Sequence, residues 1–229
     1  MKITFILICQ LLSLILGAQD SIKIRFSPKM MDEDLVLHQA YVVNEDTIHF
    51  SQLKFYISDI SFHHDDTLIY VLKKSHHLFD LSQPITTSLT EKLEAPITYN
   101  QLTFKIGIDS LTNVSGAIEG DLDPQNGMYW TWQSGYINFK LEGTSPTCPT
   151  RLNKFQWHIG GYLTPYNTIK EVSLSTQDSN KVVNIDVQID ELLQSFDLSE
   201  TYQIMGPNDR AVEIANHLPT IFKLSKNEK

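Results

Sequence analysis

The sequence predicts an all-β protein, a single-domain antiparallel β-sandwich with long loops and one or two short helices. Apolar and polar residues alternate with a period of two over many short segments, as in Leu102–Ile108 and Val183–Ile189. This period is that of half-buried strands. Turn-forming Asn, Asp, Gly and Pro separate the segments, and no long stretch has the helical period. Many short strands divided by turns are typical of a β-sandwich.

The first residues differ from the rest of the chain. Residues 1–18 contain Lys2 near the start, two apolar runs and small residues at the end. This pattern is typical of a secretory signal peptide, and the segment is shorter than the roughly 20 apolar residues of a membrane-spanning helix. We therefore expect no membrane span and an exported protein, periplasmic, at the cell surface or secreted. Its mature chain should begin near Gln19 and form one domain over 19–229.

The remaining segments can be assigned in chain order. Two short helices are expected at Asp190–Phe196 and Asp209–His217, the second ending before Pro219. The longest stretch without alternation, Asp109–Met128, is expected to be a loop, and long loops inside a compact domain are often functional. The expected strands are Ile22–Phe26, Leu35–Val43, Leu53–Phe62, Leu68–Leu72, Leu102–Ile108, Tyr136–Leu141, Phe155–Tyr162, Val172–Leu174 and Val183–Ile189.

Composition excludes some classes of function. The 229 residues include 27 acidic and 18 basic side chains, for a formal net charge of -9, so nucleic acid is not expected as a partner. Of the two cysteines, Cys9 lies in the signal peptide, so the mature chain holds only Cys148 and cannot form an internal disulfide. Its stability must come from a packed core.

The motifs of common metal and catalytic sites are missing. No HExxH, GxSxG or cysteine/histidine quartet occurs, and we do not expect an enzyme. The stretch GDLDPQNG superficially resembles a calcium-binding loop. However, Pro124 occupies its fourth position, and Trp132 stands where the bidentate glutamate belongs. We therefore expect turns there rather than a calcium site.

The histidines are the main candidates for metal ligands. In FQWHIGGY, strand alternation places His158 on the face opposite Trp157 and Ile159. Gly160 and Gly161 follow, and paired glycines let another backbone or a ligand approach closely. A strand-end histidine bonded to a loop has the same pattern, so both readings stay open at this point.

Two histidine pairs add further candidates. FHHDDT, which contains His64, is most simply a polar hairpin turn. Adjacent residues of a strand point to opposite faces, so such a pair gives one ligand easily and two only with distortion. His77 leads into the apolar run LFDL and is expected to be partly buried. A buried imidazole needs a partner, of which a metal is one kind.

Four segments in order, LKFYISDISF, HHLFDL, FKIGIDSLTNVSGAIEGDLDPQNGMYWTWQSGYINFKLEG and FQWHIGGY, resemble the MbnP-like family of exported copper-binding proteins. The resemblance covers roughly Ile22 to Leu224. It implies a secreted or surface β-rich domain that binds one copper ion chiefly through histidines. It also implies that one tryptophan near the copper is, in some relatives, oxidised to kynurenine by a dihaem enzyme of the MauG type.

Individual residues match the family's elements. His158 matches the histidine of a Phe-x-x-His-hydrophobic-Gly motif, and His77 matches a histidine that precedes Leu-x-Asp. We therefore expect His158 and His77 to approach one copper ion. If their rings lie on opposite faces, that assignment is wrong and His64 or His49 is the next candidate. The cysteine pair of many relatives is missing, since Cys148 stands alone.

Trp130 and Trp132 match the family's tandem tryptophans. On a strand both indoles would face one side and pack in the core. An indole beside copper could also be oxidised or shield Cu(I) from water. Met128, or Met205, could add a thioether ligand for Cu(I), although filling a gap in the core is the more common role of a methionine.

Three functions remain open. The first is an exported copper-binding protein for copper acquisition or handling, without turnover. The alternative is an extracellular carbohydrate- or peptide-binding β-sandwich module that uses exposed tryptophans. The third is a structural surface domain with scattered histidines. Convergence of at least two histidines separates the first from the others.

Overall fold

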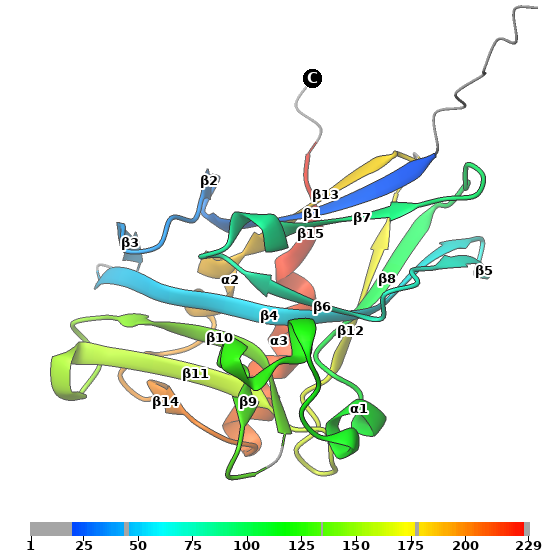
Figure 1. Cartoon of the computed structure of the whole chain (residues 1–229). Coiled ribbons are helices and arrows are strands. Elements are labelled where there is room, and N and C mark those ends of the chain that lie inside the picture. Colours follow the sequence, from blue (N-terminus) through cyan, green and yellow to red (C-terminus); the bar gives the residue numbers. More distant parts are fainter. Residues whose placement is uncertain (1–19, 44–45, 134, 177–178, 227–229) are drawn as a thin grey trace, which may run out of the picture.

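The computed structural model describes residues 20–43, 46–133, 135–176 and 179–226 (Figure 1). The predicted signal peptide lies outside these residues. Within them the strands form two sheets that enclose the main core. The smaller sheet contains β1 (Ser21–Met30), β2 (Glu33–Asp34), β7 (Ser88–Lys92), β13 (Val182–Gln188) and β15 (Phe222–Leu224).

The larger sheet is built around the long strand β4 (Asp46–His64), which runs through the middle of the molecule in Figure 1. The other strands of this sheet pair either with β4 itself or with a strand that is linked to β4 through such pairing. These are β3 (Ala40–Val43), β5 (Thr67–Val71), β6 (His76–Asp80), β8 (Gln101–Ile106), β9 (Tyr129–Trp130), β10 (Gly135–Thr144), β11 (Lys154–Gly160), β12 (Lys170–Ser175) and β14 (Gln203–Ile204).

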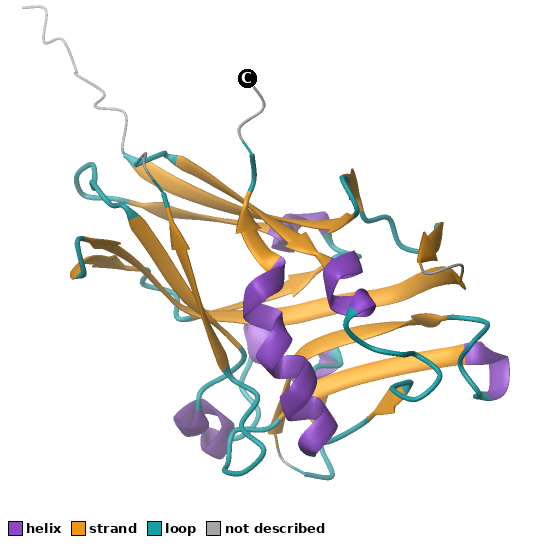
Figure 2. Cartoon of the chain, turned by 180° about the vertical axis from the view of Figure 1, so that it is seen from behind, coloured by secondary structure: helices purple, strands orange, loops and turns teal. Residues whose placement is uncertain are grey.

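Short helices complete the domain. Figure 2 shows α3 (Asp209–Ile221) running from the smaller sheet to the larger one. It packs on β11, β12, β13 and β15, and also on α2 (Ile189–Gln194). The others are α1 (Ser110–Ser115) and the 3-10 turns η1 (Pro84–Thr87), η2 (Gly120–Leu122), η3 (Pro124–Asn126) and η4 (Arg151–Asn153). No helix in the described part of the chain is long and apolar enough to cross a membrane.

The predicted β-sandwich class is confirmed, but the sheets are mixed rather than purely antiparallel. β1 pairs with β13, and β11 with β14, in parallel. A period of two identifies a strand and its buried face but contains no information on its direction. Cys148 is buried and free, in keeping with a core that needs no disulfide.

Some element boundaries differ from the prediction. Helix α3 does not end before Pro219 but continues to Ile221. Its last turn buries Leu218 and Ile221 completely or almost so, and this packing offsets the hydrogen bond that proline cannot make. Of the strand expected over Leu35–Val43, only Ala40–Val43 is extended as β3. Strands β2, β6, β7, β14 and β15 are not among the expected strands.

The expected loop Asp109–Met128 is ordered by packing. It contains α1, η2 and η3, and it covers the outer face of the larger sheet. Tyr56 Oη donates to the Asp121 carbonyl at 3.0 Å, and Tyr136 Oη to the Leu122 carbonyl at 3.1 Å. The result is a second, smaller core, made of Tyr56, Leu78, Ile108, Leu122, Met128, Trp130, Tyr136 and Ile137.

Candidate metal centre

A row of charged residues crosses the outer face of the larger sheet. Asp80 on β6 lies opposite Lys54 on β4, which lies opposite Lys140 on β10, which lies opposite His158 on β11. Residues opposite one another in neighbouring strands share a face. His158 is therefore on the face away from the main core, as its alternation with Trp157 predicted.

These charges are paired beneath the second core. Asp80 Oδ2 lies 2.9 Å from Lys54 Nζ, and His158 Nε2 lies 2.6 Å from Glu142 Oε1. Lys140 Nζ approaches Glu142 at 3.4 Å. The hydrogen bond with His158, helped by Lys140, lowers the pKa of Glu142 although burial opposes this. Glu142 is thus an ionised carboxylate held against the imidazole, and the His158 side chain is only 8% exposed.

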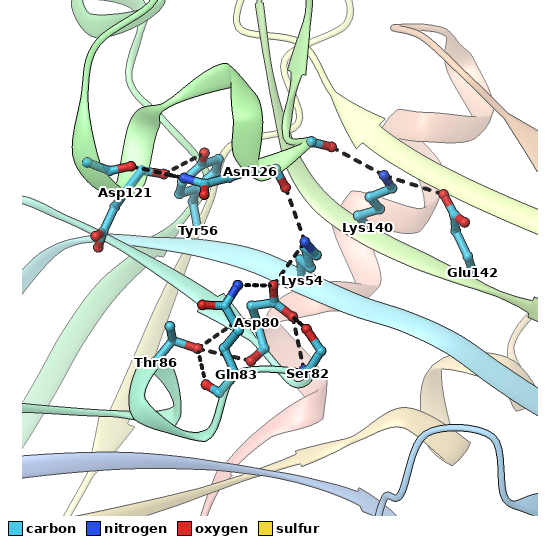
Figure 3. A network of polar contacts seen from close by, with 12 residues as sticks. Lys54, Tyr56, Asp80, Ser82, Gln83, Thr86, Asp121, Asn126, Lys140 and Glu142 are labelled. Atoms are coloured by element: carbon cyan, nitrogen blue, oxygen red, sulfur yellow. Dashed lines mark hydrogen bonds and ion pairs between the residues drawn. The ribbon is translucent and has the colours of Figure 1, made fainter.

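The two lysines also hold the overlying segment in place (Figure 3). Lys54 Nζ donates to the Asn126 carbonyl at 3.1 Å, and Lys140 Nζ to the Gly127 carbonyl at 3.2 Å. Both carbonyls stand at the end of η3, directly before Met128. The charged row therefore connects the sheet around His158 to the chain that carries the tryptophans.

Trp130 lies on the same face as His158, and the glycine after Ile159 makes room for it. A Cβ atom at Gly160 would be 2.7 Å from Trp130 Cζ3 and 2.6 Å from the Tyr136 carbonyl. The close approach expected at this glycine is confirmed, and the approaching groups are part of the protein. Trp130 is 6% exposed, and its Nε1 is buried without a hydrogen-bond partner among the described residues.

Trp132 does not share the environment of Trp130. After β9 the chain turns at residues 131–133, so the expected continuation of the strand, with both indoles in the core, is wrong. Trp132 is 68% exposed, although its ring centroid is still 5.9 Å from that of Trp130. A Cβ atom at Gly206 would be 3.2 Å from Trp132 Cη2, so this indole covers the segment that follows β14.

The same segment contains a thioether, that of Met205. The parallel pairing of β11 with β14 places Gln156 opposite Gln203 and Trp157 opposite Ile204. Met205 is the next residue, directly after the end of β14. Met205 is 40% exposed, whereas Met128 is fully buried in the second core. We call His158, Glu142, Met205, Trp130 and Trp132 the outer-face site.

His77 is not part of this site. It lies opposite Ile57, whose side chain is in the main core. Lys54 and Ile57 are three residues apart on one strand and so face opposite sides. His77 and His158 are thus on opposite faces of the sheet, and the prediction that they converge on one ion is wrong. The sequence could not show this, because it does not give the register between β6, β4, β10 and β11.

His64 is also distant from His158. It ends β4 at the hairpin with β5, where Asp65 and Asp66 have positive φ angles of 47° and 63°. The hairpin predicted from FHHDDT is therefore confirmed. His64 is exposed, 3.6 Å from Asp65, and ten residues along β4 from Lys54, roughly 30 Å of strand.

No other cluster replaces the expected histidine pair. His49 is exposed on β4. Within the described ranges, no group of three or more His, Cys, Asp or Glu side chains is placed to hold a metal. In GDLDPQNG, Asp121 is engaged by Lys74 Nζ at 2.6 Å and the Leu78 amide at 3.0 Å, as expected for turns.

Sequence reasoning missed Glu142 and Lys140. A signal was present, since INFKLEG places both on the face opposite Phe139 and Leu141. Two charged residues on one face of a strand in the middle of a sheet indicate a buried polar network. Only the pairing with β11 shows that His158 belongs to it.

Comparisons with known proteins give the family and the fold. The MbnP family model matches residues 19–207. A solved structure, MbnP from Methylosinus trichosporium, superimposes with a TM-score of 0.59 and 13% sequence identity, covering 79% of this chain and 80% of that one. At this identity the likeness shows the fold. No curated protein sequence matches the chain.

Proposed function

The chain belongs to the MbnP family, and from this premise we propose that it is an exported copper-binding protein that acquires or handles copper without catalysing a reaction. Family membership supports a methanobactin-associated, copper-related protein. The family does not by itself say which residues of this chain bind copper. Because His158 and His77 lie on opposite faces of the sheet, the two cannot both bind the same ion.

The main observation in favour of His158 as a copper ligand is its contact with Glu142. Its Nε2 is 2.6 Å from the ionised Glu142 carboxylate, so Nδ1 is the nitrogen that remains for a metal. Histidines that bind metals commonly donate their other N–H to a carboxylate, which fixes the tautomer and the orientation of the ring. Imidazole is a good ligand for copper in both common oxidation states. The residues present therefore fit copper with one well-oriented imidazole.

Met205 is the second donor that the fold offers. A thioether is a soft ligand and favours Cu(I) over Cu(II) or zinc. Its place directly after β14, which pairs with β11, supports this role, as does the position of Trp132 over the adjoining Gly206. Together the imidazole, the thioether and the covering indole suit Cu(I) better than a hard, highly coordinated cation.

The two tryptophans have different proposed roles. Trp130 is a packing residue between Gly160 and the second core. Trp132 is exposed, so an external oxidase, such as a dihaem MauG-type enzyme, has access to it. We assign kynurenine formation, where it occurs, to Trp132. Peptide mapping of the natively exported protein should then show a mass change of a few daltons at Trp132 and none at Trp130.

Export is supported by the position of the family match. It begins at residue 19, immediately after the predicted signal peptide. The carbohydrate- or peptide-binding alternative requires both tryptophans to be exposed in a groove. Trp132 meets that requirement at 68% exposure, but Trp130 at 6% does not. The geometry therefore argues against this alternative. The convergence of His158 with His77 expected for a copper site is not present, so the copper-binding proposal rests on the family and on His158 with its carboxylate partner.

A titration with matched histidine variants tests the proposal. The mature protein, His158→Ala and His77→Ala are titrated with Cu(I) in the presence of a competing chelator. We expect saturable binding by the wild type and by His77→Ala, and a loss of at least about tenfold in affinity in His158→Ala, because one imidazole ligand is removed. Equal affinity of the wild type and His158→Ala would refute the assignment.

A further inference from the structure

Strand β5 is an exposed, apolar edge of the larger sheet. In the described part of the chain it pairs with β4 alone, so the backbone groups along its other edge have no strand partner. Leu68, Ile69 and Val71 are 55%, 40% and 47% exposed. Figure 1 shows β5 at the rim of the molecule, where the hairpin with β4 projects. Exposed apolar edge strands are places at which another strand can add to a sheet.

The two ends of this sheet are built differently. β12, the strand at one end, carries Lys170 and Glu171, and α3 packs on it. β14, at the other end, is only two residues long. Charges, a covering helix and short length are common means by which proteins prevent pairing at an edge. β5 is five residues long and contains no charged side chain.

The charges that flank β5 have opposite signs at its two ends. The segment reads DDTLIYVLKK, with Asp65 and Asp66 before the strand and Lys73 and Lys74 after it. All four side chains are exposed. Those of Asp66 and Lys73 form no hydrogen bond or ion pair with another described residue. Such a strand is complementary in charge to a second copy of itself in the antiparallel direction, and not in the parallel direction.

We propose that two copies of this protein associate through β5, edge to edge and antiparallel, about a two-fold axis. Full overlap of the two strands places Ile69 opposite Ile69 of the second copy, and Thr67 opposite its Val71. The acidic end of each β5 then lies beside the basic end of the other. The backbone groups of the two edges pair, and the exposed apolar side chains of both copies are partly covered.

The symmetry limits the assembly to two copies. Each copy has one β5 edge, which the pairing uses up, so the contact closes on itself. The register with β4 shifts at Ile69, and such a bulge twists an edge strand and restricts its pairing. The interface is also small, so we expect a dimer that dissociates in the micromolar range. It contains no residue of the outer-face site and does not depend on copper.

Sedimentation of the mature protein at increasing concentration, with a copper chelator and at low ionic strength, tests the proposal. We expect a reversible equilibrium between monomer and dimer. Ile69→Lys sets two like charges opposite each other at the two-fold axis and should weaken the dimer at least about tenfold. Val42→Lys is the matched control and should leave the dimer unchanged. Val42 is 65% exposed on β3, another apolar strand that pairs with β4.

Two charge variants test the antiparallel direction without altering the apolar residues. Asp66→Lys and Lys73→Asp each bring like charges together at both ends of the interface, so each alone should dimerise several-fold more weakly. An equal mixture of the two should associate about as tightly as the wild type, because opposite charges face each other again. Both positions are exposed, so folding should be unaffected, and this result decides the matter even if Ile69→Lys is poorly folded.

Three results would overturn the proposal. A wild type that stays monomeric at every concentration would leave the β5 edge to a strand of another protein. A dimer of unchanged affinity in Ile69→Lys would place the contact elsewhere on the molecule. Mixed charge variants that associate no more tightly than each alone would exclude antiparallel pairing of β5 with β5.

Discussion

In the proposed copper site, the carboxylate of Glu142 determines which nitrogen of His158 is left for the metal. With Nε2 held at 2.6 Å, the ring has one tautomer and one orientation. Glu142→Ala should weaken copper binding about 10- to 100-fold, the usual effect of losing an outer-sphere partner of a ligating histidine. Glu142→Gln retains an accepting oxygen and should lose less. The measurement is chelator competition, and equal affinity in the wild type and Glu142→Ala would show that the carboxylate has no such role.

Mild acid should release copper from the proposed site, because protons compete with the metal for the imidazole ligand. A copper-bound imidazole must be deprotonated, so protons compete with the metal as the pH falls through the histidine range near about 6.5. Copper retained after dialysis at a series of pH values should drop steeply across this range. Full occupancy down to about pH 4 would instead point to thioether or carboxylate ligands without an imidazole.

Asp109 should make the free energy of unfolding depend on pH, in a range more acidic than that of copper release. Burial would raise its pKa, but hydrogen bonds from Thr112 and the contact with His76 outweigh this and lower the pKa to about 2. Since the folded pKa is below the unfolded value of about 3.9, the carboxylate stabilises the fold above about pH 4. That contribution is lost as the pH falls from about 4 toward 2.

Asp109→Asn isolates this effect, because asparagine can still cap α1 at Thr112 but does not titrate. The difference in Tm between wild type and variant should be largest near neutral pH and shrink toward about pH 2. A difference that stays constant over this range would mean that the ionised form of Asp109 contributes nothing to stability.

At the scale of elements, the β9–β10 hairpin depends on the missing side chain at Gly160. Gly160→Ala would press a methyl group against Trp130 and the Tyr136 carbonyl, and should destabilise the protein by about 1–3 kcal/mol. The matched control is Gly135→Ala, where the nearest atom to a Cβ is 3.6 Å away in ordinary contact. Urea unfolding compares the two. Equal effects would contradict the packing of Trp130 described above.

The strands also show which structural features can be predicted from the alternation of apolar and polar residues. Period-two alternation located most strands and the correct face of His158, because alternation is a property of one strand. It failed for Trp132, because a two-residue strand followed by a turn has no room to establish a period. It failed for the pair His77 and His158 because their separation depends on the register across four strands.

At the scale of the whole molecule, the sandwich class followed from the sequence, whereas the second core did not. Apolar residues in Asp109–Met128 have no regular spacing, so nothing local shows that they cover the outer face of the larger sheet. Of the two lysines that hold this segment, Lys54 lies 72 residues from its partner Asn126 in the chain, whereas Lys140 lies 13 residues from its partner Gly127. The outer-face site is therefore a product of tertiary structure.

Metal analysis of the protein purified from its native export compartment is the most direct test of whether His158 holds copper. The wild type, His158→Ala and His77→Ala are purified in parallel, and copper per chain is measured by mass spectrometry. We expect about one copper per chain in the wild type and in His77→Ala, and little in His158→Ala. A wild type without copper, or equal copper in His158→Ala, would contradict it.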